Sequence, residues 1–199
     1  MENPYHNVKF LLSAPSIRGC PEDTGFEVVI AGRSNAGKSS AINTLTGQKK
    51  LARVSKTPGR TQHLVYFELD SDRKIVDLPG YGFAKVPFEV KKKWHQSMEE
   101  FFQNRKAISG GVIVMDIRHP LMEFDQMMLN WMTAMNIPVH ILLTKADKLS
   151  FGAAKNVALK INKTVSRYQN VSVQTFSSLK NSGIEELHQK LNQFLNYEN

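Results

Sequence analysis

The stretch from Gly32 to Ser39 combines two glycines, a lysine and a serine in a spacing that suits phosphate binding. It reads GRSNAGKS and matches the pattern G-x-x-x-x-G-K-[ST]. Glycines allow successive backbone N–H groups to turn toward phosphate oxygens, and the helix expected after them adds its positive end. Lys38 would contact the β- and γ-phosphates of a nucleotide, and the Ser39 hydroxyl would bind Mg²⁺. The predicted phosphate loop comprises Gly32, Arg33, Ser34, Asn35, Ala36, Gly37, Lys38 and Ser39.

A second group of residues can select the base of that nucleotide. Thr-Lys-Ala-Asp follows directly after an apolar run and ends at Asp147. A carboxylate there can accept hydrogen bonds from N1–H and the exocyclic amine of guanine, whereas adenine offers neither donor and would leave the carboxylate unpaired. The aliphatic part of Lys145 can lie against the base, and N–H groups after a later run can reach the guanine carbonyl. The predicted base site comprises Thr144, Lys145, Ala146, Asp147, Phe176, Ser177 and Ser178.

A third group closes the apolar run that begins at Lys74. There Asp77 would hold Mg²⁺ through water, and the Gly80 N–H would face the γ-phosphate, so that the segment after Gly80 senses whether that phosphate is present. In the loop before the second strand, Thr61 is our choice for a second protein ligand of Mg²⁺, and Thr57 is the alternative. We expect Lys38, Thr61 and Gly80 to serve catalysis, Ser39 and Thr61 to bind the metal, and the nucleotide site to include Gly59, Arg60, Thr61, Gln62, His63, Asp77, Leu78, Pro79 and Gly80.

The elements that must position these groups follow from apolar runs that alternate with helical periodicities. Such alternation predicts an α/β fold with a mostly parallel sheet. Ser182 and Glu185 form a capping-box pattern ahead of the last helix. Strands are expected at Phe26–Ala31, Leu64–Leu69, Lys74–Leu78, Gly111–Ile117, Val139–Leu143 and Val171–Phe176, and helices around Ser39–Leu45, Trp94–Phe102, Met128–Met135, Ala154–Val165 and Ile184–Leu195.

Length and composition restrict the class of protein. A chain of 199 residues with 41% hydrophobic and 22% charged residues suits one globular domain. The single cysteine, Cys20, excludes an internal disulfide framework and leaves too little thiol for a zinc site. No apolar run approaches the ~20 residues of a membrane span, and the first residues do not read as a signal peptide. We expect a cytoplasmic protein without membrane contact, monomeric by default, with residues 1–24 as an N-terminal extension packed on a single domain of residues 25–199.

Taken in order, the motifs GRSNAGKS, TPGRT, DLPG, TKAD and FSS resemble those of the translation-factor-related small GTPases. More narrowly, they are similar to the EngB (YihA/YsxC) group of bacterial ribosome-assembly GTPases, over about residues 10–195. The resemblance implies a P-loop GTPase domain, or G domain, in which helices cover both faces of a six-stranded, mostly parallel sheet whose second strand is antiparallel. It also implies GTP and Mg²⁺ as ligands, hydrolysis of GTP to GDP, and a role in maturing the large ribosomal subunit that normal growth and cell division require.

Two residues bear on how fast GTP would be hydrolysed. Tyr81 follows Gly80 at the place where Ras-like enzymes carry the glutamine that orients the attacking water. Because a tyrosine cannot do this in the same way, we expect slow intrinsic hydrolysis that a partner or an ion accelerates. Asn35 matches the asparagine that helps to hold K⁺ in related potassium-stimulated GTPases. Stimulation by K⁺ is therefore a hypothesis, and stabilisation of the loop is the alternative role of Asn35.

The charge of the chain points to a polyanionic partner. Lys and Arg number 26 against 18 Asp and Glu, a formal net charge of +8. Residues 47–67 contain five Lys or Arg residues and no Asp or Glu, and Lys91–Lys93 follow soon after Gly80. The γ-phosphate should order both segments, so binding to RNA phosphates would depend on the nucleotide. The predicted partner is a precursor of the large ribosomal subunit with its ribosomal RNA.

Two other functions share parts of this pattern. Small-molecule kinases have a similar length and phosphate loop, but they would need an Arg-rich lid and would not need Thr-Lys-Ala-Asp. A non-hydrolysing RNA-binding module with a vestigial pocket is the other alternative. The residues expected for GTP binding and hydrolysis are intact, which argues against a vestigial pocket; they are Lys38, Ser39, Thr61, Asp77 and Asp147.

Overall fold

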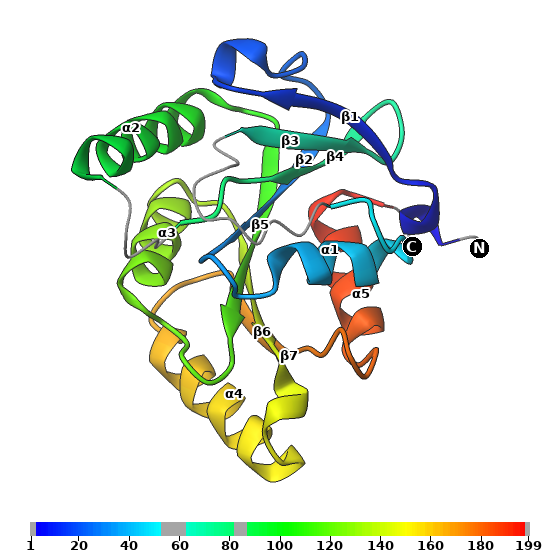
Figure 1. Ribbon diagram of the computed structural model, residues 1–199, viewed down its shortest axis with the longest axis vertical. Helices are drawn as coiled ribbons and strands as arrows, with labels where there is room; N and C mark the ends of the chain where they lie inside the picture. Colours follow the sequence, from blue (N-terminus) through cyan, green and yellow to red (C-terminus); the bar gives the residue numbers. More distant parts are fainter. Residues whose placement is uncertain (1–2, 53–62, 82–86, 198–199) are drawn as a thin grey trace.

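A seven-stranded sheet positions the predicted site residues (Figure 1). The computed structural model describes residues 3–52, 63–81 and 87–197. In the order β1-β3-β4-β2-β5-β6-β7, neighbouring strands pair in parallel from β4 to β7, and β3 is antiparallel to both of its neighbours. The strands are β1 (Lys9–Ala14), β2 (Phe26–Gly32), β3 (Leu64–Glu68), β4 (Arg73–Asp77), β5 (Ile108–Asp116), β6 (Val139–Thr144) and β7 (Val171–Thr175).

The expected number of six strands was wrong, because the N-terminal segment adds a strand to the sheet. β1 pairs antiparallel with β3 and forms one edge, with Lys9 opposite Glu68 and Ala14 opposite Leu64. The side chains of β1 are mostly exposed or half-buried, as at Phe10, so the sequence lacks the alternation that identifies a strand with one buried face. The antiparallel direction of β3, the second of the expected strands, is as predicted.

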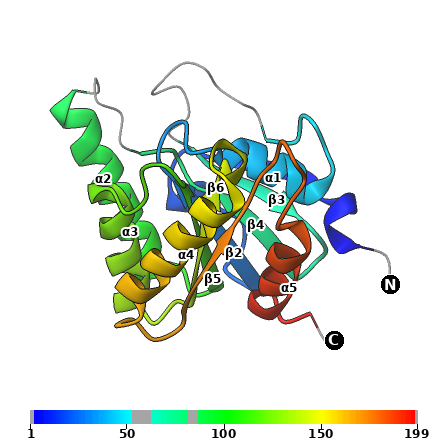
Figure 2. The ribbon, with the colours of Figure 1, turned by 90° about the horizontal axis from the view of Figure 1, so that it is seen from below.

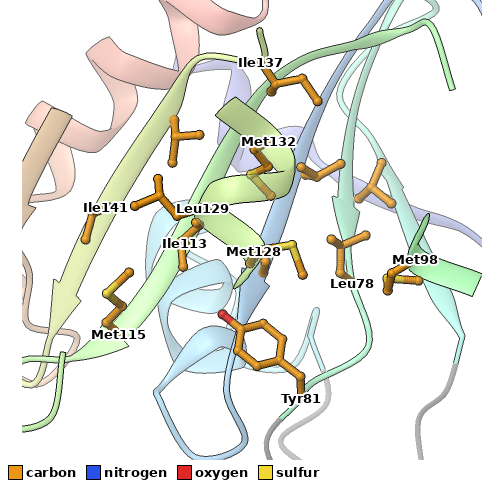
Figure 3. Close-up of a cluster of buried hydrophobic side chains, with 14 of the residues drawn as sticks. Leu78, Tyr81, Met98, Ile113, Met115, Met128, Leu129, Met132, Ile137 and Ile141 are labelled. Atoms are coloured by element: carbon orange, nitrogen blue, oxygen red, sulfur yellow. The ribbon is translucent and has the colours of Figure 1, made fainter. Parts of the chain in front are cut away.

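Helices cover both faces of the sheet (Figures 1 and 2). α2, α3 and α4 lie on one face, and their apolar sides share one core cluster, part of which Figure 3 shows. α1 and α5 lie on the other face and share a second cluster with Tyr5 and Val8. The helices are α1 (Lys38–Thr46), α2 (Phe88–Asn104), α3 (Glu123–Ala134), α4 (Phe151–Val165) and α5 (Ile184–Phe194), with short 3₁₀ turns at Pro4–Asn7, Ile17–Gly19 and Ala146–Lys148.

Two adjacent glycines let helices approach β5 from both faces. A side chain at Gly110 would collide with the Phe194 ring of α5, and one at Gly111 with the Met132 sulfur of α3. Because consecutive residues of a strand point to opposite faces, the pair admits one helix on each side. β5 begins at Ile108, three residues earlier than expected.

The predicted capping box of the last helix was also wrong. α5 begins at Ile184, and the residue before it, Gly183, has a left-handed backbone with φ 81° and makes no side-chain cap. Ser182 instead exchanges backbone hydrogen bonds with Ser177. In the described parts of the chain, no helix combines the length and the apolar character that crossing a membrane requires.

Candidate nucleotide site

The carboxyl ends of the parallel strands meet at one edge of the sheet, and the three predicted motifs follow them there. The phosphate loop leaves β2 at Gly32, the Asp77 motif ends β4, and Thr-Lys-Ala-Asp follows β6. This edge is where open α/β sheets bind their ligands. Segments that are distant in the sequence are therefore brought together as the motifs require.

The phosphate loop has the backbone that its glycines predict. Gly37 precedes α1 with φ 96°, and Asn35 has φ 65°, so both adopt the left-handed conformation. A side chain at Gly32 would come within 2.9 Å of the Val114 carbonyl oxygen, which leaves no room for one. The loop thus leads directly into the N-terminus of α1, where the first N–H groups of the helix and its dipole favour an anion.

Two residues of the base motif hold the phosphate loop in place. The buried Thr144 hydroxyl lies within hydrogen-bonding distance of the carbonyl oxygens of Ala36 and Met115. The Lys145 ammonium group donates to the carbonyl oxygen of Asn35 at 2.6 Å. From the sequence, Thr144 and Lys145 were predicted to contact only the base, because contacts between segments about a hundred residues apart leave no local pattern.

The ammonium group of Lys38 forms an ion pair with Oδ1 of Asp77. Both side chains are largely buried, and they come from the phosphate loop and from the end of β4. The structure therefore places the cation predicted to contact phosphate beside the carboxylate predicted to hold Mg²⁺ through water.

The two segments predicted to bind guanine also meet. Oδ1 of Asp147 accepts a hydrogen bond from the Ser177 hydroxyl at 2.6 Å, and the Ala146 N–H donates to the Phe176 carbonyl oxygen at 3.1 Å. The hydrogen bond from Ser177 lowers the pKa of the Asp147 carboxyl below its ordinary value. At neutral pH the carboxylate is therefore ionised and can accept hydrogen bonds from a base.

Asp116 is a site residue that sequence reasoning missed. It ends β5, and its carboxylate accepts two hydrogen bonds from the Arg118 side chain and pairs with Lys145 at 3.0 Å. Burial raises the pKa of Asp116, but the contacts with Arg118 and Lys145 outweigh burial and hold the pKa well below its usual range. Asp116 thereby fixes the Lys145 ammonium group between β5 and the phosphate loop. Its position at the end of a strand was the only signal available in the sequence.

The side chain of the residue after Gly80 is buried in the core. Tyr81 is 2% exposed, and its side chain enters the core cluster beneath α3, as Figure 3 shows. Its hydroxyl donates a hydrogen bond to Oδ1 of Asp125 at 3.1 Å. The Tyr81 hydroxyl is thus engaged in the core, and we assign it no contact with an attacking water.

Part of the predicted site lies outside the described residues, namely Thr57, Gly59, Arg60, Thr61 and Gln62. His63 is exposed and lies with Nδ1 3.0 Å from the Ser13 hydroxyl of β1, at the sheet edge. The roles of these residues toward a nucleotide stay predictions.

The arrangement as a whole can bind a nucleotide from both ends. Backbone N–H groups, the α1 N-terminus and Lys38 provide positive charge for phosphates, while the Asp147 carboxylate lies at the predicted base site. The N–H groups of Phe176 and Ser177, which were predicted to reach the guanine carbonyl, donate instead to the carbonyl oxygens of Leu143 and Ser182. The oxygen donors of Ser39 and Asp77 beside this position are the ligands that Mg²⁺ prefers, so the residues fit that metal.

Comparison with known proteins supports this assignment. A family model described as a 50S ribosome-binding GTPase matches residues 27–145. The probable GTP-binding protein EngB of Ruthia magnifica is 59% identical over 197 residues, which cover 99% of both chains. The protein of the same name from Shigella flexneri is 53% identical over 188 residues, which cover 94% of this chain and 90% of that one.

Solved structures show the same fold. A crystal structure of a probable GTP-binding protein engB matches with a TM-score of 0.69 at 24% identity and covers 86% of this chain and all of that one. A structure of Era in complex with MgGDPNP and a segment of 16S ribosomal RNA matches with a TM-score of 0.63 at 21% identity, over 86% of this chain and 57% of that one. At such identities the likeness supports the P-loop GTPase fold alone.

Proposed function

Because this chain belongs to the EngB family of GTP-binding proteins and is a GTPase, we propose that it acts as a GTP-dependent switch in the assembly of the large ribosomal subunit. The proposal that this chain binds a guanine nucleotide rests mainly on Lys145, whose ammonium group contacts both Asp116 and the phosphate loop. These contacts bring the base motif and the phosphate motif into one site. The ribosomal part is supported by the match to the 50S ribosome-binding model. Such a protein would act in the cytoplasm, as a monomer, and normal growth and cell division would depend on it.

Guanine selection would come from Asp147. Its ionised carboxylate, fixed by the Ser177 hydroxyl, can accept from both donors of guanine. Adenine would not supply these two donors to the carboxylate, a penalty of roughly 1–3 kcal/mol or more. A preference of the purified chain for ADP over GDP would contradict this and would favour a small-molecule kinase.

In hydrolysis, we assign the chain's residues to holding and neutralising the phosphates. Lys38 would contact the β- and γ-phosphates, and the Gly80 N–H would donate to the γ-phosphate. Ser39 and Thr61 would hold Mg²⁺, with Asp77 acting through water. When bound, Mg²⁺ would neutralise negative charge that develops on the phosphate oxygens.

Intrinsic hydrolysis should be slow, because the Tyr81 hydroxyl is engaged with buried Asp125. Acceleration would come from the ribosomal particle or from K⁺ held with the help of Asn35, which is exposed in the phosphate loop. Turnover in KCl should exceed turnover in NaCl at the same ionic strength, and Asn35→Ala should remove the difference. Equal rates in both salts would exclude the K⁺ hypothesis.

Basic surfaces among the described residues support a ribosomal RNA partner. Lys49, Lys50 and Lys91–Lys93 are exposed next to the segments that the γ-phosphate should order. Residues 148–183 carry no Asp or Glu at all. Their cations are all exposed, namely Lys148, Lys155, Lys160, Lys163, Arg167 and Lys180.

Binding to purified large-subunit particles tests the proposal. With a non-hydrolysable GTP analogue, binding should be stronger than with GDP and should weaken steeply with added salt. A variant with Lys91, Lys92 and Lys93 changed to Glu should lose the preference for the GTP state. The matched control changes Lys155, Lys160 and Lys163 of α4 to Glu, with the same change in net charge, and should keep the preference. Equal binding in both nucleotide states would contradict the switch, and binding without any turnover would favour a non-hydrolysing RNA module.

A further inference from the structure

A buried carboxylate connects the phosphate loop with the segment that follows Gly80. Asp125 lies in the first turn of α3, and its residue is 0% exposed. Oδ1 accepts the hydrogen bond from the Tyr81 hydroxyl at 3.1 Å, and Oδ2 accepts one from the Met122 N–H at 3.0 Å. Oδ2 also lies 3.8 Å from Nε of Arg33 in the phosphate loop. Three segments thus converge on one side chain.

The same two segments are joined through their backbones. Arg33 and Tyr81 form a parallel bridge, in which the Ser34 N–H donates to the Tyr81 carbonyl oxygen at 2.8 Å. The Tyr81 N–H lies 3.4 Å from the carbonyl oxygen of Gly32. Gly80 is therefore held between Asp77, at the end of β4, and Tyr81, which is fixed in the core.

Burial of a carboxylate at this place is costly and needs a reason. An apolar residue would pack in the same cluster without loss of hydration, whereas a buried charge is tolerated only when it is paired and hydrogen-bonded. Burial raises the pKa of Asp125, and the contacts with Tyr81, Met122 and Arg33 oppose that rise. The Met122 contact caps α3, but capping alone would not require Tyr81 and Arg33.

We propose that Asp125 is a positioning residue, which through Tyr81 and Arg33 holds the Gly80 N–H ready for the γ-phosphate. The inference rests on the proposed role of Gly80 in binding that phosphate. If the N–H is positioned in advance, less conformational entropy is lost when a nucleotide with a γ-phosphate binds, and the binding free energy is more favourable. GDP makes no use of this N–H, so the arrangement favours GTP over GDP.

The test variant is Tyr81→Phe, which removes one hydroxyl and keeps the buried ring. Tyr5→Phe is the matched control, because Tyr5 is likewise buried, at 1% exposed, and its hydroxyl donates to Asn192 at 2.7 Å, on the other face of the sheet. We expect Tyr81→Phe to raise the Kd for a non-hydrolysable GTP analogue about tenfold, with less than a twofold change for GDP. KM for GTP should rise, and kcat should fall as well, because the Gly80 N–H is expected to serve catalysis besides binding the γ-phosphate. Tyr5→Phe should change neither affinity.

Asp125→Asn gives an independent measurement, since it removes the charge that faces Arg33 and leaves one acceptor oxygen in place of the two that serve Tyr81 and Met122. It should weaken binding of the GTP analogue selectively, and the double variant should lose less than the sum of the two single losses. Equal losses for GDP and the GTP analogue, or a fall in Tm with unchanged affinities, would overturn the inference and leave the proposed function standing. Failure of the wild-type chain to prefer GDP to ADP would overturn both.

Discussion

The hydroxyl of Thr144 donates toward the carbonyl oxygen of Ala36, so the last residue of β6 supports the phosphate loop from below. The contact is buried, and a side chain at Gly37, the next residue of the loop, would meet the same threonine side chain. The base motif and the phosphate loop are therefore connected directly. A substitution in the base motif should also change how the loop binds phosphates.

Replacement of Thr144 by Val should weaken binding of GDP and of a GTP analogue equally. The valine fills the same space but leaves the Ala36 carbonyl oxygen without its partner, which costs roughly 1–3 kcal/mol. We expect about a tenfold rise in both Kd values in a fluorescence titration. Thr133→Val, which removes a hydroxyl bonded to Leu129 within α3, is the control and should leave both values unchanged. A selective loss of one nucleotide would show that Thr144 acts otherwise.

Replacement of Asp147 by Asn should change which base is bound. The amide no longer offers two acceptors to guanine, so GDP affinity should fall at least a hundredfold, from roughly 1.5–3 kcal/mol for each charge-assisted bond. An amide N–H can instead donate to the second carbonyl oxygen of xanthine, and binding of xanthosine diphosphate should rise. Calorimetry with both nucleotides measures the exchange. Undiminished GDP binding would remove Asp147 from the base site.

Replacement of Glu27 by Ala should destabilise the whole domain. Glu27 in β2 is 0% exposed and pairs with Arg105 through two hydrogen bonds, at 2.6 and 3.0 Å. Without the carboxylate, the nearly buried guanidinium keeps its contacts with the carbonyl oxygens of Pro21 and Glu22 and a longer ion pair with Asp23 at 3.5 Å, so most of the compensation of its charge is lost. We expect the free energy of unfolding to fall by about 3–5 kcal/mol in urea.

A double variant checks the cause of that loss. If the loss of charge compensation at Arg105 is responsible, Glu27→Leu combined with Arg105→Met should recover most of the stability. A double variant as unstable as Glu27→Ala would point to lost packing instead.

His140 should make stability depend on pH. Its ring is 2% exposed and lies 2.8 Å from both the Ser172 hydroxyl and Oε1 of Gln174. Burial lowers the pKa of His140 from 6.5 to about 4. Between these pH values the unfolded chain binds a proton that the folded chain does not, so the free energy of unfolding should fall by about 3 kcal/mol as pH falls from 6.5 to 4.

The contribution of His140 can be separated from that of the carboxylates by urea unfolding. The wild-type chain and His140→Gln are each unfolded at pH 7.5 and at pH 4.5. The variant should lose less stability between the two pH values than the wild-type chain does. The same loss in both proteins would assign the pH dependence to other groups.

The sequence predicted those parts of the molecule that depend on local pattern. The order of strands and loops around Gly32–Ser39, Asp77–Gly80 and Thr144–Asp147 follows from short motifs whose chemistry requires a strand before them, and the structure has each strand in place. The helix faces were predictable as well, because Met128 and Met132 recur at helical spacing and are buried.

Other features depend on contacts that no local pattern contains. β1 is a strand because it pairs with the edge of β3, a contact that its own sequence does not predict. The residue that precedes α5 is Gly183, which has a left-handed backbone, and not Ser182, which the sequence pattern predicted as the cap. Asp125 and Asp116 look like ordinary surface carboxylates in the sequence, and besides their local partners they contact Arg33, Tyr81 and Lys145, which lie between 29 and 92 residues away.

The two apolar clusters on opposite faces of the sheet need not open together. α2 buries only Met98, Phe101 and Phe102 among its 17 residues, whereas the α1 and α5 face also includes Tyr5 and Val8 from the N-terminal segment. Amide protons of α2 should therefore exchange with solvent through a partial opening that leaves the opposite layer folded. The layer that holds Tyr81 and Asp125 could in this way rearrange at a fraction of the cost of global unfolding.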